Sequence, residues 1–203
     1  MNHRFRFLPI ATVVAGLILT GAICLSRWIS AAEAPDGDGT LFAGFVSVLR
    51  DPRCLNCHSD GDFPRQGDDG HQHTMNIRRG PDGEGVTAQK CGACHQEHNL
   101  AGAHMPPGAP HWRLPAPEMP MIWQGLTDAR ICRSIKDPEE NGDRTVEQIV
   151  DHLANDRLVL WGWNPGEGRD PVPMPHDEFV SKVKQWRDAG APCPADSSEK
   201  VER

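Results

Sequence analysis

The segment Cys54–His58 reads CLNCH and the segment Cys91–His95 reads CGACH, two copies of the pattern C-x-x-C-H. This pattern is typical of covalent haem attachment in c-type cytochromes. The two thiols have the spacing to form thioethers with the two vinyl groups of one haem, and the adjacent histidine is the expected proximal ligand of the iron. The sequence therefore predicts two covalently bound haem c groups, held by Cys54, Cys57 and His58 and by Cys91, Cys94 and His95.

The same four cysteines allow a second interpretation. Two C-x-x-C pairs also have the spacing of a zinc ribbon, in which four thiolates bind one Zn²⁺. A zinc ribbon does not need a histidine directly after each second cysteine, whereas haem attachment does. Haem is therefore the preferred cofactor, and a structural zinc site is the alternative.

Composition indicates a chain that is short of core-forming side chains. The 203 residues include 20 glycines and 18 prolines, no tyrosine and only six phenylalanines. Small domains with little core often depend on a bound cofactor, and two porphyrins would add apolar surface. The formal net charge of −7 argues against a nucleic-acid partner.

The first residues predict export. Arg4 and Arg6 precede an almost entirely apolar run over residues 8–25, and Ala32-Glu33-Ala34 offers a small-x-small cleavage site. The apolar run is long for a signal peptide, and Arg27 follows it like the flank of a membrane anchor. A cleaved signal and an uncleaved anchor are both open, and in either case the mature chain lies in the periplasm.

A short apolar helix is expected before the first motif, over residues 41–49, and Pro52 should end it. We expect this helix to pack on the first porphyrin, the alternative being a core helix without haem contact. Residues 59–90, between the motifs, are rich in glycine and lack apolar periodicity, so they predict turns.

Each iron needs a sixth ligand, and several side chains are candidates. His71 and His73 lie between the motifs, and His98, His104 and Met105 follow the second one. Short loops favour local closure, which pairs His73 with the first iron and the 104–105 pair with the second, although crossed ligation is also open. Met105 is preferred over His104, because a thioether raises the haem potential.

Three helices are predicted after residue 117. They begin near Thr127, at the Thr145 capping box and near His176, and the last one runs to Ala189. His152 and His176 fall on polar faces and are expected to be solvated. The run Leu158–Trp163 is expected to be strand-like, with its tryptophans against a haem or in the core.

Cys132 and Cys193 remain outside the haem motifs. In an oxidising compartment two such cysteines are expected to form a disulfide, with two free thiols as the alternative. The bond would tie the end of the last helix to the first of the three.

Several segments resemble bacterial cytochromes commonly labelled isoquinoline 1-oxidoreductase subunits. The resemblance covers roughly residues 50–194 and lies in segments 67–73, 91–100, 102–110, 119–121, 132–138, 158–163 and 190–194. It implies that His73 and the His104–Met105 pair are ligand candidates ahead of His71 and His98. It also implies a cytochrome that accepts electrons from a molybdenum hydroxylase, and not the hydroxylation itself.

Together these features predict a mainly α, loop-rich fold, with a dihaem cytochrome c region followed by a small disulfide-stapled helical region. The expected parts are an export signal or anchor (1–34), the dihaem region (35–117), the helical region (118–196) and a polar tail (197–203). The predicted function is non-enzymatic electron transfer from a dehydrogenase to a cytochrome or oxidase, with membrane association through the N-terminal segment. The alternative is a haem enzyme or gas or redox sensor with an open iron position.

Overall fold

The computed structural model describes residues 39–196, which all belong to one compact unit. The predicted export segment 1–34 and the polar tail 197–203 lie outside the described residues. Within residues 39–196, no helix is both long enough and apolar enough to cross a membrane.

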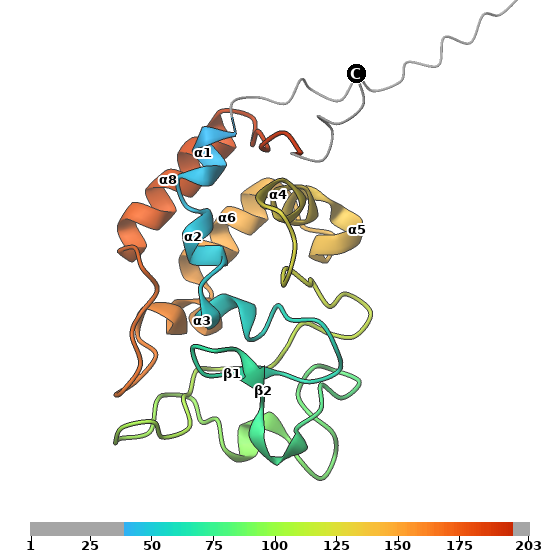
Figure 1. Ribbon diagram of the computed structural model, residues 1–203, viewed down its shortest axis with the longest axis vertical. Coiled ribbons are helices and arrows are strands. Elements are labelled where there is room, and N and C mark those ends of the chain that lie inside the picture. The colour runs from blue at the N-terminus through green and yellow to red at the C-terminus, as the bar shows by residue number, and fades with distance from the viewer. Residues whose placement is uncertain (1–38, 197–203) are drawn as a thin grey trace, which may run out of the picture. The chain divides into compact units, whose positions relative to one another are not determined.

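The described part is rich in helix and has one two-stranded sheet, which confirms the mainly α, loop-rich expectation. In Figure 1 most helices gather together, and the loop-rich segment with β1 and β2 lies beyond α3. The elements are α1 (Thr40–Ala43), α2 (Val46–Leu49), α3 (Pro52–Leu55), β1 (Arg65–Gln66), β2 (His71–Gln72), η1 (Thr74–Asn76), η2 (Cys91–Ala93), α4 (Asp128–Lys136), α5 (Pro138–Asn141), α6 (Val146–Asn155), α7 (Arg157–Leu160), η3 (Trp161–Trp163) and α8 (His176–Asp188).

Aromatic side chains from both ends of the described chain form the core. Phe42 of α1 lies with its ring centroid 5.9 Å from that of Trp186 on α8, and Phe45 lies 5.9 Å from Phe179. All four are essentially inaccessible to solvent. The expectation that residues 41–49 pack on a porphyrin is therefore wrong for these phenylalanines, because α8 already covers them.

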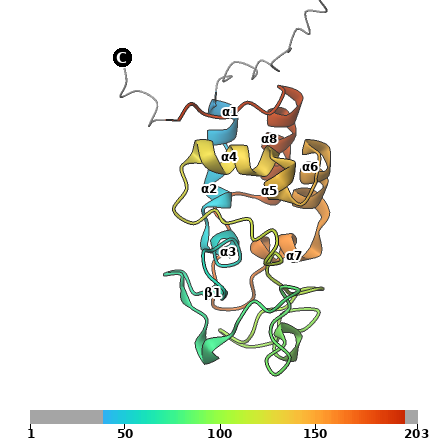
Figure 2. The same cartoon turned by 90° about the vertical axis from the view of Figure 1, so that its right-hand side faces the viewer.

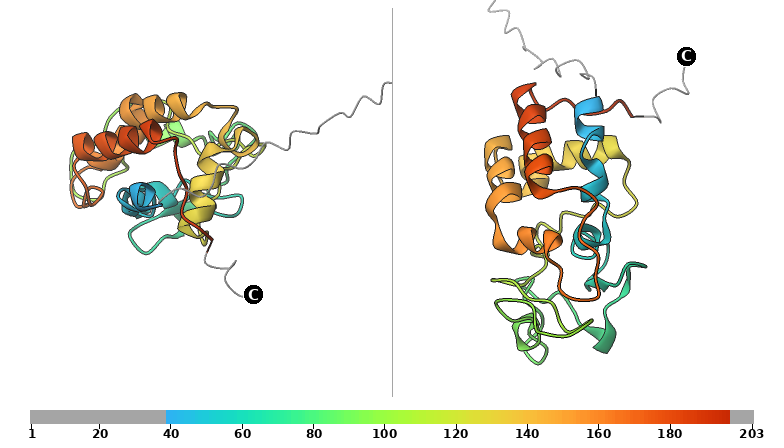
Figure 3. Two further views of the ribbon diagram at one scale, coloured as in Figure 1. Left: turned by 90° about the horizontal axis from the view of Figure 1, so that it is seen from above. Right: turned by 90° about the vertical axis from the view of Figure 1, so that its left-hand side faces the viewer.

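The three helices predicted for the C-terminal region are confirmed. Thr127 caps α4 by accepting a hydrogen bond from the Arg130 amide, and Thr145 forms a reciprocal capping box with Gln148. Figure 3 shows α6 and α8 side by side, and Figure 2 shows α4 crosswise to α1 and α2.

The predicted disulfide between Cys132 and Cys193 is also confirmed, with Cα atoms 5.6 Å apart. It joins α4 to the segment that follows α8. Both cysteines belong to the hydrophobic core, so the bond lies among apolar side chains.

The strand expected at Leu158–Trp163 is wrong. Asp156 accepts a hydrogen bond from the Leu158 amide and so begins the short helix α7, which continues into η3. The side chain of Trp163 then reaches the loop before α8, where its indole N–H donates to Met174 O at 2.7 Å. The N-cap at Asp156, one residue before α7, is the local signal that decides against a strand.

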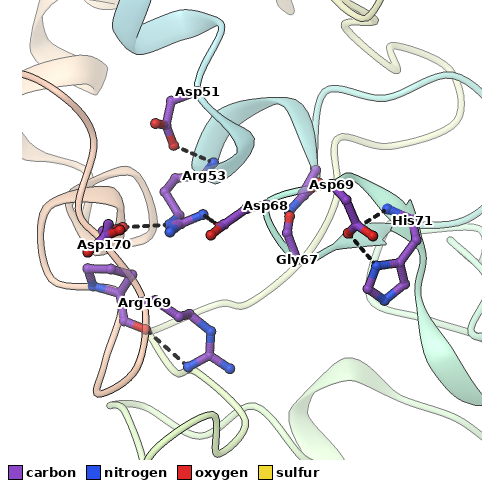
Figure 4. A network of polar contacts seen from close by, with 10 residues as sticks. Asp51, Arg53, Gly67, Asp68, Asp69, His71, Arg169 and Asp170 are labelled. Carbon is purple, nitrogen blue, oxygen red and sulfur yellow. Dashed lines mark hydrogen bonds and ion pairs between the residues drawn. The ribbon is translucent and has the colours of Figure 1, made fainter.

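An arginine in α3 connects the loop after the first motif to the loop before α8. Arg53 is 9% exposed, forms an ion pair with Asp68, and donates from Nε to Asp170 O at 2.8 Å. Figure 4 shows its guanidinium between these two residues. Because Arg53 directly precedes Cys54, this network fixes the position of the first C-x-x-C-H segment.

Candidate functional site

The two C-x-x-C-H segments have the same local backbone. In each, the amides of the second cysteine and of the histidine both donate to the carbonyl of the first cysteine, to Cys54 O at 3.1 and 3.0 Å and to Cys91 O at 3.1 and 2.9 Å. The resulting turn presents two thiols and one imidazole together. The first turn continues from α3, which is capped by Asp51, and the second is part of η2.

All four motif thiols are free, so neither C-x-x-C pair is a disulfide. Burial raises the pKa of Cys54 to about 12 and that of Cys57 to about 11, and the nearby Cys91 raises the pKa of Cys57 further. Burial also raises the pKa of Cys91. Cys91 can raise the pKa of Cys57 only if the two thiols, and so the two motifs, lie near one another.

Each motif histidine is held through Nδ1. His58 Nδ1 lies 2.9 Å from Met121 O, and His95 Nδ1 lies 2.7 Å from Pro107 O. A carbonyl oxygen only accepts, so Nδ1 carries the proton and Nε2 is left with a free lone pair. Metal-ligating histidines are typically oriented in this way.

Burial favours the neutral form of both rings. It lowers the pKa of His58 to about 4, and the nearby charges of His152 and Arg79 lower it further. It likewise lowers the pKa of His95 to about 4, with a smaller contribution from the charge of His73. Neutral imidazole is the form that binds a metal.

A tryptophan covers one face of each imidazole. The His58 ring stacks on Trp123 with centroids 3.8 Å apart and planes 9° from parallel, and His95 stacks on Trp112 at 4.4 Å and 3°. Stacking and the Nδ1 hydrogen bond together leave each ring little freedom to rotate. Neither tryptophan was predicted from the sequence, because neither is adjacent to its histidine in the chain.

Two polar groups beside the first motif fit the carboxylates of a haem. Trp123 is 4% exposed, yet its indole N–H has no acceptor among the described residues. Arg79 is 2% exposed, and among residues 39–196 its guanidinium donates to the carbonyls of Pro115 and Gly61, at 2.6 and 3.1 Å. Burial lowers the pKa of Arg79, and the nearby charge of Asp62 opposes this shift. A buried donor without a partner is costly, and a buried cation favours an anion nearby. Haem propionates would supply both the acceptor and the charge.

The structure places the predicted ligand His73 beside the second motif. Its ring centroid lies 6.1 Å from that of His95, with the planes at 67°. Its Nδ1 lies 2.8 Å from Thr74 O, so Nε2 is the ring nitrogen that remains available, as in His58 and His95. The sequence favours His73 as a ligand of the first iron. The structure instead places it beside His95 of the second motif, which is the crossed arrangement that the sequence leaves open.

The other sixth-ligand candidates lie elsewhere. The His104 amide donates to Glu167 O at 2.9 Å, and Met105, which is 42% exposed, accepts at its carbonyl from Arg169 at 2.9 Å. His71, which the resemblance disfavours, is exposed and pairs with an aspartate two residues before it, and His98 is exposed.

His152 differs from the prediction that it is solvated. Its side chain is 34% exposed, and its Nδ1 lies 3.1 Å from the Asp156 carboxylate. Burial lowers the pKa of His152 as well. The i, i+4 spacing of His152 and Asp156 is a sequence signal that points to this pair.

The zinc alternative finds no support in the geometry. Among residues 39–196, no three histidine, cysteine, aspartate or glutamate side chains are grouped so as to hold a metal ion.

Comparisons of the chain with known protein families, curated proteins and solved structures find no match.

Proposed function

We propose that this chain is a periplasmic dihaem c-type cytochrome that transfers electrons from a dehydrogenase to a respiratory acceptor. The observation that supports it best is the repeated arrangement of the motif histidines. His58 and His95 each follow two free thiols, donate Nδ1–H to a backbone carbonyl and keep Nε2 free. A proximal haem ligand next to two thioether bonds needs these properties.

The residues that would hold the cofactors follow from this arrangement. Cys54 and Cys57 would bind one haem c and Cys91 and Cys94 the other, with the histidines as axial ligands. When bound, each haem supplies a one-electron redox centre. The chain contributes fixed ligand orientation, a partly apolar surrounding and, at Trp123 and Arg79, polar groups for propionates.

Electron transfer between the two centres is favoured by their proximity. His73, from the loop after the first motif, lies with its ring centroid 6.1 Å from that of His95, and Cys91 lies near enough to Cys57 to contribute to its raised pKa. Two haems held by motifs that lie near one another in space can exchange an electron, and this function needs no substrate site. This arrangement supports a carrier.

The partners are inferred from the sequence. The resemblance to cytochromes labelled isoquinoline 1-oxidoreductase subunits favours a molybdenum hydroxylase as the donor, with a cytochrome or oxidase as the acceptor. The arginine-flanked apolar run favours export and, if it is not cleaved, attachment to the inner membrane.

A redox titration of the purified holoprotein, followed by exposure of the reduced form to carbon monoxide, tests the proposal. A carrier should show two reversible one-electron steps and no fast carbon monoxide binding, because both irons are six-coordinate. Rapid, complete binding of carbon monoxide at one haem of the wild type would contradict the carrier function and favour an enzyme or sensor.

A further inference from the structure

We propose that His73 is the sixth ligand of the iron held by the second motif, opposite His95. The proposal rests on the proposed function, since it requires a haem at Cys91 and Cys94. It makes the loop that follows the first motif a structural part of the second haem site.

The spacing of the two rings fits a shared iron. Metal–imidazole bonds are about 2.0–2.1 Å long, so two imidazoles on opposite sides of one metal have ring centroids about 6 Å apart. The observed separation of His73 and His95 is 6.1 Å. The 67° between the planes is compatible with this, because each ring is free to turn about its own metal–nitrogen bond.

Both rings have the same nitrogen available. The Nδ1 of His73 lies 2.8 Å from Thr74 O and that of His95 lies 2.7 Å from Pro107 O, so in each case Nε2 is the nitrogen left for the metal. A metal ion bound between the two rings would use the Nε2 lone pair of each.

The backbone around His73 holds it in this place. The His73 amide donates to Pro64 O at 3.0 Å, directly after the β1–β2 pair. The Thr74 amide donates to the side chain of Gln66 at 3.1 Å. Gln89, two residues before Cys91, donates to Met75 O at 2.9 Å. These contacts connect the His73 segment to the first hairpin and to the approach to the second motif.

The competing ligands approach from the wrong side. Pro107 O binds Nδ1 of His95, so the segment that carries it lies at the end of the imidazole opposite Nε2. His104 and Met105 precede it closely, and their backbones are bound to Glu167 and Arg169. A sixth ligand must reach the far face of the haem, which favours His73 over both.

The consequence is that the two haem sites depend on each other. The segment between the motifs, which begins next to the first haem, would supply His73 as a ligand of the second haem. Two histidine ligands would also give the second haem a lower potential than the Met/His pair expected from the sequence.

Replacement of His73 in the full-length holoprotein tests the proposal. His73→Ala should keep two covalent haems, convert one iron from low-spin to high-spin, and allow one carbon monoxide per two haems to bind the reduced protein. Added imidazole should restore the low-spin spectrum. The matched control is His71→Ala, two residues away, which should change none of these properties.

Removal of one haem at a time shows which iron is affected. In Cys54→Ser/Cys57→Ser, which keeps only the second haem, His73→Ala should open the iron; in Cys91→Ser/Cys94→Ser it should have no effect on the remaining iron. An unchanged second iron, or an opened first iron, would overturn the proposal. Where a single-haem variant does not mature, His73→Met in the two-haem protein should raise one of the two potentials and leave the other unchanged, and two unchanged potentials would overturn the proposal. Absence of covalent haem from the wild type would instead refute the proposed function itself.

Discussion

The imidazole of His58 lies flat on the indole of Trp123, with ring centroids 3.8 Å apart and planes 9° from parallel. The equivalent pair at the second motif, His95 and Trp112, has nearly the same geometry at 4.4 Å and 3°. The difference is that Trp123 is buried and its N–H has no acceptor among residues 39–196, whereas Trp112 is partly exposed. The two tryptophans therefore form a matched pair for mutation.

Trp123→Phe is expected to lower the potential of the first haem by tens of millivolts, while the covalent haem content stays at two. The phenyl ring keeps the stacking but removes the donor that we assign to a propionate, and an uncompensated propionate favours ferric iron. For one electron, about 59 mV corresponds to a tenfold change in equilibrium constant. Spectroelectrochemistry measures both potentials.

Trp112→Phe is the control and should shift neither potential appreciably. Equal shifts in the two variants would mean that the smaller ring, and not the loss of the buried N–H, controls the potential. No shift in Trp123→Phe would remove Trp123 as a propionate partner.

Local signals made much of the helical region predictable from sequence. The capping box at Thr145 and Gln148 and the cap at Thr127 involve residues three apart, so they form wherever the helix forms. The disulfide followed from two cysteines left over in a chain whose sequence predicts export. These features do not depend on the rest of the fold.

The contacts around the motif histidines depend on distant parts of the chain. Met121 O, which binds His58, is 63 residues away from it, and no local pattern pairs the two. The position of the His73 ring beside the second motif has the same origin, because loop length favours the nearest iron while the β1–β2 pair places the ring near His95. The residues 41–49 were assigned to a porphyrin because their aromatic partners on α8 lie more than 130 residues later.

Replacing Cys132 and Cys193 by serine is expected to lower the free energy of unfolding by about 4 kcal/mol, the chain-entropy value for a loop of this length. Denaturant unfolding of the holoprotein, followed by far-ultraviolet circular dichroism, measures the change. The haem content should stay at two, because the disulfide connects α4 to the end of α8 and not to a motif. Unchanged stability would show that the core around α4 and α8 holds without the bond.

Two sets of residues are candidates for the sixth ligand of the first iron. The sequence pairs His73 with the first iron and leaves crossed ligation open, in which case Met105 or His104 would bind the first iron. The structure adds His152 as a candidate, because Asp156 holds its Nδ1 at 3.1 Å, which leaves Nε2 available, and because its charge contributes, less than burial does, to the lowered pKa of His58. We expect His152→Ala to open the first iron to carbon monoxide, and Met105→Ala to leave both irons low-spin.

The control for this prediction is His176→Ala on α8, whose ring contacts Leu153 O at 3.4 Å and should not affect either iron. A weak far-red sulfur–iron band in the oxidised wild type that disappears in Met105→Ala would contradict the assignment to His152. Such a result would make Met105, and not a histidine, the sixth ligand of one iron.

The most direct test of the central claim is haem quantitation on the intact polypeptide, exported from a host that attaches haem c. The account predicts two haems per chain that stay with the polypeptide in acid–acetone and on denaturing gels, with peptide masses placing them at Cys54/Cys57 and Cys91/Cys94. Extraction of all haem into acid–acetone, or one zinc ion bound in place of haem, would contradict it.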